Sequence, residues 1–149
     1  MMRARKVWIL LADGGNARII ERVAPFGKLI EIQSLTHSHQ LTHEHGRDRP
    51  GRGFGPGGAY HHAYESHTDW HDQQKNDFAK EIVHILNKAR LDRKFEELYI
   101  FAPAKMIGLI REHIIHADSQ IKAKISREIS KDDIHFTLSE IQEYIDELP

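Results

Sequence analysis

The chain contains no cysteine. This absence excludes disulfide bonds, zinc sites built on thiolates and cysteine nucleophiles. The chain also has little net charge, because 21 lysines and arginines stand against 22 aspartates and glutamates. A balance of this kind gives the protein as a whole no strong attraction for nucleic acid or for an anionic membrane. Any such partner has to be bound by a local patch of charge.

Long apolar runs are lacking as well. The basic N-terminus is followed by an apolar run at residues 7–12, which ends at Asp13. This run is shorter than the roughly 7 to 15 residues of a signal-peptide core and the roughly 20 of a membrane helix. We therefore expect a cytoplasmic protein with no membrane insertion. At 149 residues with 40% hydrophobic residues, the chain has the size of one domain that spans residues 1–149.

The spacing of apolar residues predicts three antiparallel strands, followed by helix, strand, helix, strand and helix. Thr137 and Glu140 have the spacing of a capping box at the start of the last helix. Strands that are joined through helices run parallel, so the predicted fold class is α/β, with a mixed sheet covered by helices. The strands are expected at residues 7–12, 17–23, 28–35, 98–102 and 121–129, and the helices from residues 78, 103 and 138 onward.

The periodic pattern disappears between the third strand and the first helix. Residues 36–74 hold six of the ten glycines and two of the five prolines, and Leu41 and Phe54 are almost their only large aliphatic or phenylalanine side chains. We predict a long loop rich in glycine, histidine and arginine at about residues 37–74. A loop of that length within a domain is usually either functional or disordered.

Histidine is in excess in this loop, which carries eight of the chain's 12 histidines. Neutral imidazole is the commonest metal ligand, so a subset of these residues is a candidate zinc or nickel site, although no fixed metal-binding signature is present. The alternatives are a solvated polar loop and a patch that responds to pH, because imidazole titrates near pH 6.5. We expect that the protein requires no cofactor. The candidate ligands are His37, His39, His43, His45, His61, His62, His67 and His71.

The same loop carries three arginines within six residues, Arg47, Arg49 and Arg52. Glycines around them allow close backbone approach, and Phe54 and Tyr60 are available to stack on bases. This combination suits RNA phosphates and unpaired bases. The other interpretation is a loop made soluble by arginine and flexible by glycine.

A third candidate lies where the strand at residues 98–102 ends and Pro103 starts a helix. This edge of an open α/β sheet commonly binds ligands, and a helix N-terminus attracts phosphate, here with Lys105 and Arg111 nearby. The alternative is an ordinary turn, with Gly108 letting the helix lie close to the sheet. We assign no catalytic residue, since Asp13 at the end of the first strand has no clear acidic partner.

Five stretches stand out together, VWILLADGGNARI at residues 7–19, DRPGR at 48–52, FA at 78–79, APAKMIGLIRE at 102–112 and KDD at 131–133. Through these stretches the chain resembles, over nearly its whole length, the bacterial host attachment protein family, named as proteins required for attachment to host cells. That family is similar to the central domain of class 1 archaeo-eukaryotic peptide release factors, which implies a mixed sheet of ribonuclease-H-like character.

In such release factors a long loop carries Gly-Gly-Gln, whose glutamine helps to place the water that hydrolyses peptidyl-tRNA. Here Gly57 and Gly58 are followed by Ala59. The resemblance therefore implies a non-catalytic module that contacts tRNA or the ribosome through its basic, glycine-rich loop. The alternatives are a histidine-loop metal or pH sensor with an indirect role in attachment, and a peptidyl-tRNA or RNA hydrolase. The lack of an export signal speaks against a direct adhesin, and an exposed edge strand would favour a homodimer.

Overall fold

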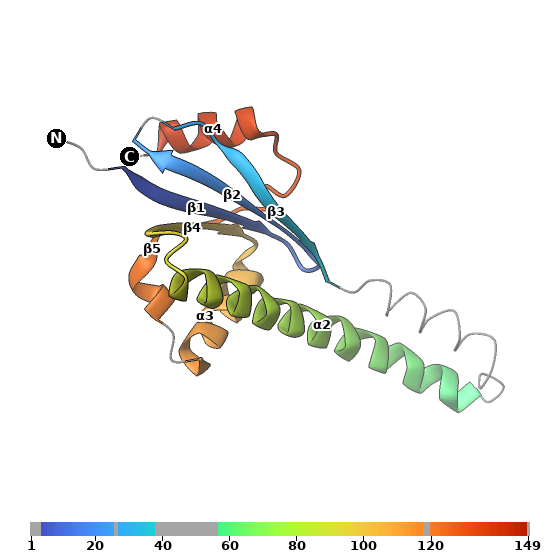
Figure 1. Ribbon diagram of the computed structural model, residues 1–149. Helices are drawn as coiled ribbons and strands as arrows, with labels where there is room; N and C mark the ends of the chain where they lie inside the picture. The colour runs from blue at the N-terminus through green and yellow to red at the C-terminus, as the bar shows by residue number, and fades with distance from the viewer. Residues whose placement is uncertain (1–3, 26, 38–56, 118–119, 149) are drawn as a thin grey trace.

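The computed structural model describes residues 4–25, 27–37, 57–117 and 120–148, and for residues 57–69 it describes the backbone alone. These residues form a five-stranded sheet, three α-helices and one 3₁₀ helix (Figure 1). The strands are β1 (Arg5–Ala12), β2 (Asn16–Ala24), β3 (Ile30–Thr36), β4 (Glu97–Ala102) and β5 (Ile125–Ser130). The helices are α2 (Gly57–Leu91), α3 (Ala104–His116), the 3₁₀ helix η1 (Gln120–Lys124) and α4 (Leu138–Glu147).

The sheet is mixed, with the strand order β3-β2-β1-β4-β5. Strand β1 pairs antiparallel with β2 and parallel with β4, so that Leu10 lies opposite Ile19 on one side and Ile100 on the other. Strand β3 extends the antiparallel half, and β5 extends the parallel half. This arrangement confirms the predicted α/β class and the predicted direction of every strand.

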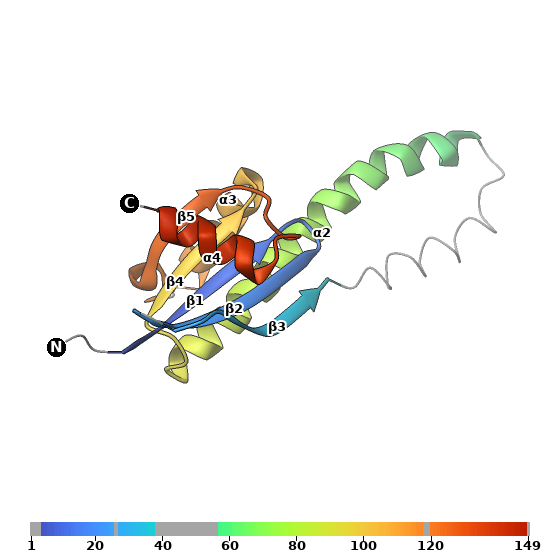
Figure 2. The same ribbon diagram turned by 90° about the horizontal axis from the view of Figure 1, so that it is seen from above.

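Strand β1 is buried on both faces from residue 7 to residue 12. Its side chains alternate between two hydrophobic cores, as the period of a strand requires. Trp8, Leu10 and Ala12 pack in the core under α2 and α3. The intervening side chains pack against α4, which lies across the opposite face of the sheet (Figure 2). The fold therefore has three layers, with the sheet in the middle.

Two polar side chains fix the local geometry of the antiparallel half. The carboxylate of Asp13 accepts the N–H groups of Gly15 (2.9 Å) and Asn16 (2.7 Å), which closes the turn between β1 and β2. Arg18 of β2 donates to the carbonyls of Ile134 (2.9 Å) and Phe136 (2.6 Å) in the segment before α4. Its guanidinium also pairs with Glu31 of β3 at 2.7 Å, so one side chain links two strands to the approach of α4.

Helix α2 begins at Gly57, so the predicted loop is wrong for residues 57–74, while residues 38–56 lie outside the described residues. No glycine or proline occurs between Gly58 and Phe78, so nothing interrupts a helix there. The N-terminal part of α2 extends beyond the sheet (Figure 1). A helix that covers no core needs no apolar face, which explains the missing periodicity.

The last strand is shorter than predicted, and the last helix begins as predicted. Residues 120–124 form η1 instead of the start of a strand, and η1 buries Ile121 completely while Lys122 stays exposed. Alternation at residues 121–125 did not distinguish a single 3₁₀ turn from an extended strand. At α4, the capping box between Thr137 and Glu140 is confirmed by both of its hydrogen bonds.

Strand β3 is a free edge of the described sheet. Its pairing with β2 shifts register near Ile32, and Ile30 and Ile32 are 60% and 42% exposed. A bulge at an edge disturbs pairing with another strand. The homodimer expected from an exposed edge strand stays a prediction. In the described part of the chain, no helix is both long and apolar enough to span a bilayer.

Asp133 is a buried acidic residue in the segment between β5 and α4. It is 2% exposed, and neither carboxylate oxygen has a hydrogen-bond partner among the described residues. Burial raises the pKa of the Asp133 carboxyl, Lys131 opposes this effect and Asp132 adds to it. Because the folded-state pKa lies above the unfolded-state value, the folded protein binds more protons in between. The free energy of unfolding therefore falls as the pH rises through this range.

We expect Asp133→Asn to raise the free energy of unfolding at neutral pH by about 1 kcal/mol, since it removes an unsatisfied buried charge. Urea unfolding at several pH values measures the effect. The gain should shrink as the pH falls through the raised pKa of Asp133 and vanish below 3.8, the ordinary aspartate value, because the carboxyl is then protonated in both the folded and the unfolded state. Asp132→Asn, at the exposed neighbour, is the matched control. An equal gain from both variants, or a gain independent of pH, contradicts this assignment.

Candidate nucleic-acid interface

The arginine cluster expected to contact RNA lies outside the described residues. This holds for Arg47, Arg49, Arg52 and Phe54, while Tyr60 lies in the helical backbone of α2. Their role in RNA contact stays a prediction. The structure locates the remaining two residues of that set, Lys105 and Arg111, on α3.

Lys105 and Arg111 are both exposed and both paired with a carboxylate. Lys105 Nζ lies 2.8 Å from Asp72 Oδ1 of α2, and this bond lowers the pKa of the Asp72 carboxyl. Arg111 makes a two-pronged pair with Glu128 of β5, which raises the pKa of Arg111. The two partners belong to different elements, α2 and β5, so these ion pairs do not join Lys105 and Arg111 to each other. Their role in phosphate binding stays a prediction.

The start of α3 is an ordinary turn after β4. Pro103 occupies the cap position with no side-chain hydrogen bond, and its carbonyl accepts the N–H of Ile107. The prediction that Gly108 lets this helix lie close to the sheet is wrong, because Gly108 is exposed and a Cβ there would meet no atom within 4 Å. Close packing of α3 on the sheet does not depend on glycine at this position.

The histidines proposed as metal ligands are only partly described. His39, His43 and His45 lie outside the described residues, and His61, His62 and His67 lie in the helical backbone of α2. The side chain of His37 bonds Glu81 of α2 at 3.3 Å and packs on Phe78. His71 lies about two turns before Phe78 on the same helix. Among the described residues, no three metal-ligating side chains are placed to hold an ion. The zinc or nickel site stays a prediction.

The structure reveals a different basic site, a groove of about 230 Å³ between α2 and α3. Residues three or four positions apart on α2 supply one wall, because they share one face of the helix. The last two turns of α3 supply the other wall. We call this feature the α2–α3 groove, and its lining residues are Lys80, Val83, His84, Asn87, His113, His116 and Ala117.

Polar contacts orient the α3 wall of the groove. His113 Nε2 lies 2.9 Å from the side-chain oxygen of Asn76, and the rings of His113 and His116 are 6.5 Å apart. The side chains of Lys80, His84 and His116 make no hydrogen bond or ion pair with any residue that the structure describes. Their donors therefore face solvent and are available to a ligand.

Among the residues that the structure describes, no acidic side chain lines the α2–α3 groove. The nearest acids on α2 are engaged elsewhere, since Asp77 accepts a hydrogen bond from Gln73 and Glu81 bonds His37. The described lining thus combines one lysine and three protonatable imidazoles with no carboxylate. Such a site attracts anions and offers N–H donors to phosphate oxygens.

Sequence reasoning missed this groove because its residues come from two helices separated by β4. A signal was present in the spacing, since Lys80 and His84 are four apart and His113 and His116 are three apart, each pair on one helical face. The larger histidine cluster at residues 37–71 is the more conspicuous pattern in the sequence.

Comparison with known proteins gives one family. A family model described as "Protein required for attachment to host cells" matches residues 8–145. A search of curated proteins finds no match.

We expect neutral His113 to carry its proton on Nε2, because the side-chain oxygen of Asn76 only accepts hydrogen bonds. The ¹⁵N chemical shifts of the imidazole nitrogens report this tautomer directly. Asn76→Leu should lower the Nε2-protonated fraction of His113 to that of free histidine. A proton on Nδ1 in the native protein would contradict the orientation of this groove wall.

Proposed function

The chain belongs to the family of proteins required for attachment to host cells, and from this premise we propose that it serves attachment as a non-catalytic RNA-binding module. The RNA is a tRNA or ribosomal RNA, whose phosphates bind in the α2–α3 groove. The observation that carries this proposal is the groove's set of one lysine and three histidines, with no acid among the described lining residues. Phosphate contacts of this kind supply most of the affinity of nucleic-acid binding.

The shape of the groove suits a nucleic-acid backbone. It runs between two helices and stays open to solvent on the side of Lys80, His84 and His116, which are all exposed. The volume of about 230 Å³ is small for an enclosed organic ligand but sufficient for a phosphate group that remains part of a longer chain. Val83 adds an apolar contact at the base, where it is buried.

RNA is favoured over other polyanions by the rest of α2. The helix starts at Gly57, and Gly58 follows, so the first two residues of its first turn carry backbone N–H groups without a Cβ. The distance along the axis from Gly57 to Lys80 is about 35 Å, so one helix offers two separate places for phosphate contact. The resemblance to release-factor central domains, whose loop reaches the acceptor end of tRNA, supports the same choice.

Binding rather than hydrolysis is the proposed activity. A release factor places glutamine after its glycine pair, and this chain has Ala59 after Gly58. Asp13, the carboxylate at the end of β1, shapes a turn through two backbone N–H groups. Its described contacts give it a structural task.

We expect the double variant Lys80→Ala, His116→Ala to weaken binding of full-length protein to tRNA about tenfold, because it removes two N–H donors that face the phosphate. The slope of log affinity against log salt should fall by about one for each charge removed. Fluorescence anisotropy with labelled tRNA measures both quantities.

The matched control is Lys28→Ala, His135→Ala, which removes one exposed lysine and one exposed histidine outside the groove. Equal losses in the two double variants would show general charge attraction and would contradict the proposed site. Binding of heparin without binding of tRNA would assign the groove to a sulfated glycan and would overturn the choice of RNA.

A further inference from the structure

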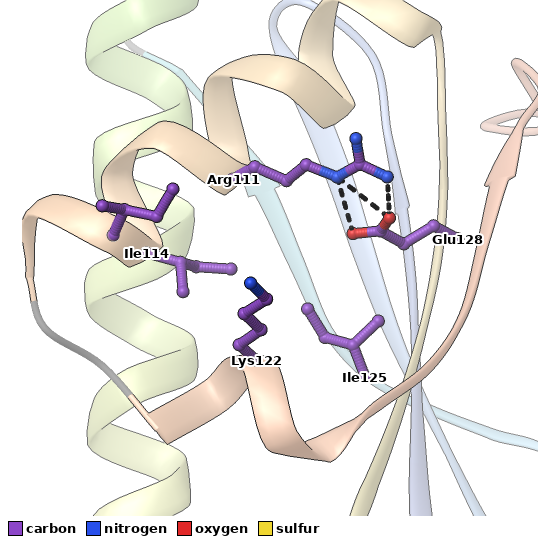
Figure 3. A pocket seen from close by; sticks show the side chains of 6 residues that line it. Arg111, Ile114, Lys122, Ile125 and Glu128 are labelled. Atoms are coloured by element: carbon purple, nitrogen blue, oxygen red, sulfur yellow. Dashed lines mark hydrogen bonds and ion pairs between the residues drawn. The ribbon is translucent and has the colours of Figure 1, made fainter.

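A second cavity lies on the other side of α3, between this helix, η1 and β5 (Figure 3). Its volume is about 380 Å³, which is within the usual range of roughly 300 to 1,000 Å³ for small-molecule sites. It shares no lining residue with the α2–α3 groove, so the inference below is independent of RNA binding. Its lining residues are Arg111, Ile114, Ile115, Lys122, Ile125 and Glu128.

Three isoleucines form the apolar part of the cavity. Ile114 belongs to the core and is 3% exposed, Ile125 is half-buried, and Ile115 is 67% exposed. Ile115 is among the most exposed large apolar side chains of the described residues. A solvent-exposed isoleucine beside a cavity offers an alkyl chain a surface that gains free energy when water leaves it.

The charged part of the cavity has one excess positive charge. Arg111 and Glu128 pair with each other on one wall, and Glu128 is the less exposed of the two. Lys122 extends from η1 between Ile114 and Ile125 (Figure 3), and it makes no hydrogen bond or ion pair with the described residues. Glu128, the one acid among the described lining residues, is therefore already paired, while the ammonium group of Lys122 is available.

We propose that this cavity binds an aliphatic carboxylate. The carboxylate of the ligand pairs with Lys122 Nζ, and its alkyl chain lies against Ile114, Ile115 and Ile125. The pair of Arg111 and Glu128 closes one side of the cavity. Two sources have this chemistry, a free fatty acid of medium chain length and the C-terminal residue of a peptide that ends in an aliphatic side chain.

Calorimetry of the full-length protein with octanoate tests the site. We expect a dissociation constant below about 1 mM, and an affinity that rises about fourfold for each methylene added from butyrate to octanoate. Lys122→Met keeps the length of the side chain and removes its charge, and it should weaken octanoate binding at least tenfold. Lys124→Met, on the same 3₁₀ helix but outside the cavity lining, should leave binding unchanged.

Two further experiments show whether binding depends on more than charge and which kind of carboxylate the cavity takes. Ile115→Ser changes an exposed position, so the fold is retained, and it should weaken octanoate binding while leaving acetate binding unaffected. A peptide ending in leucine is compared with its amidated form, and binding of only the free acid assigns the site to a peptide C-terminus, whereas binding of octanoate alone assigns it to a fatty acid. The proposal is overturned if neither ligand binds, if octanol binds as well as octanoate, or if Lys122→Met binds like the native protein.

Discussion

The burial of β1 on both faces is the constraint on which the rest of the structure depends. Its six apolar residues from 7 to 12 need a helical layer on each side of the sheet, and the chain supplies α4 on one side and α2 with α3 on the other. Because α2 and α3 cover the same face, they lie side by side and leave a groove between them. The basic side chains of the candidate site point into solvent at that groove because the apolar residues of the same helices are held by the core.

Most of the fold was predictable because the sheet-forming segments have strong patterns. The continuous apolar run of β1, the turn at Asp13 and the capping box at Thr137 each specify one structure, and all three are found. The long helix α2 was not predictable over residues 57–74, because apolar periodicity reports contact with a core and that part extends beyond it. The 3₁₀ helix η1 was not predictable for a related reason, because only Ile121 in it is fully buried.

The candidate site was less predictable than the fold. Composition identifies clusters that are contiguous in the chain. The α2–α3 groove instead combines Lys80 and His84 with His113 and His116, which lie on a second helix after an intervening strand. The sequence also did not reveal which cations are neutralised. Lys105 and Arg111 looked like phosphate ligands, but each pairs with a carboxylate from a different neighbour of α3. Only the three-dimensional contacts separate such paired cations from available ones.

The near-zero net charge of the chain thus hides an uneven distribution. Carboxylates that pair with Lys105, Arg111 and Arg18 leave the α2–α3 groove as a local positive site. The most direct measurement is a ¹H–¹⁵N NMR titration of the full-length protein with a minihelix that carries a tRNA acceptor stem. The account predicts that, among the described residues, the largest shift changes fall on the walls of the α2–α3 groove, at His84 and His116 in particular. Changes confined to α4 and β3, on the far side of the sheet and at its edge, would contradict it.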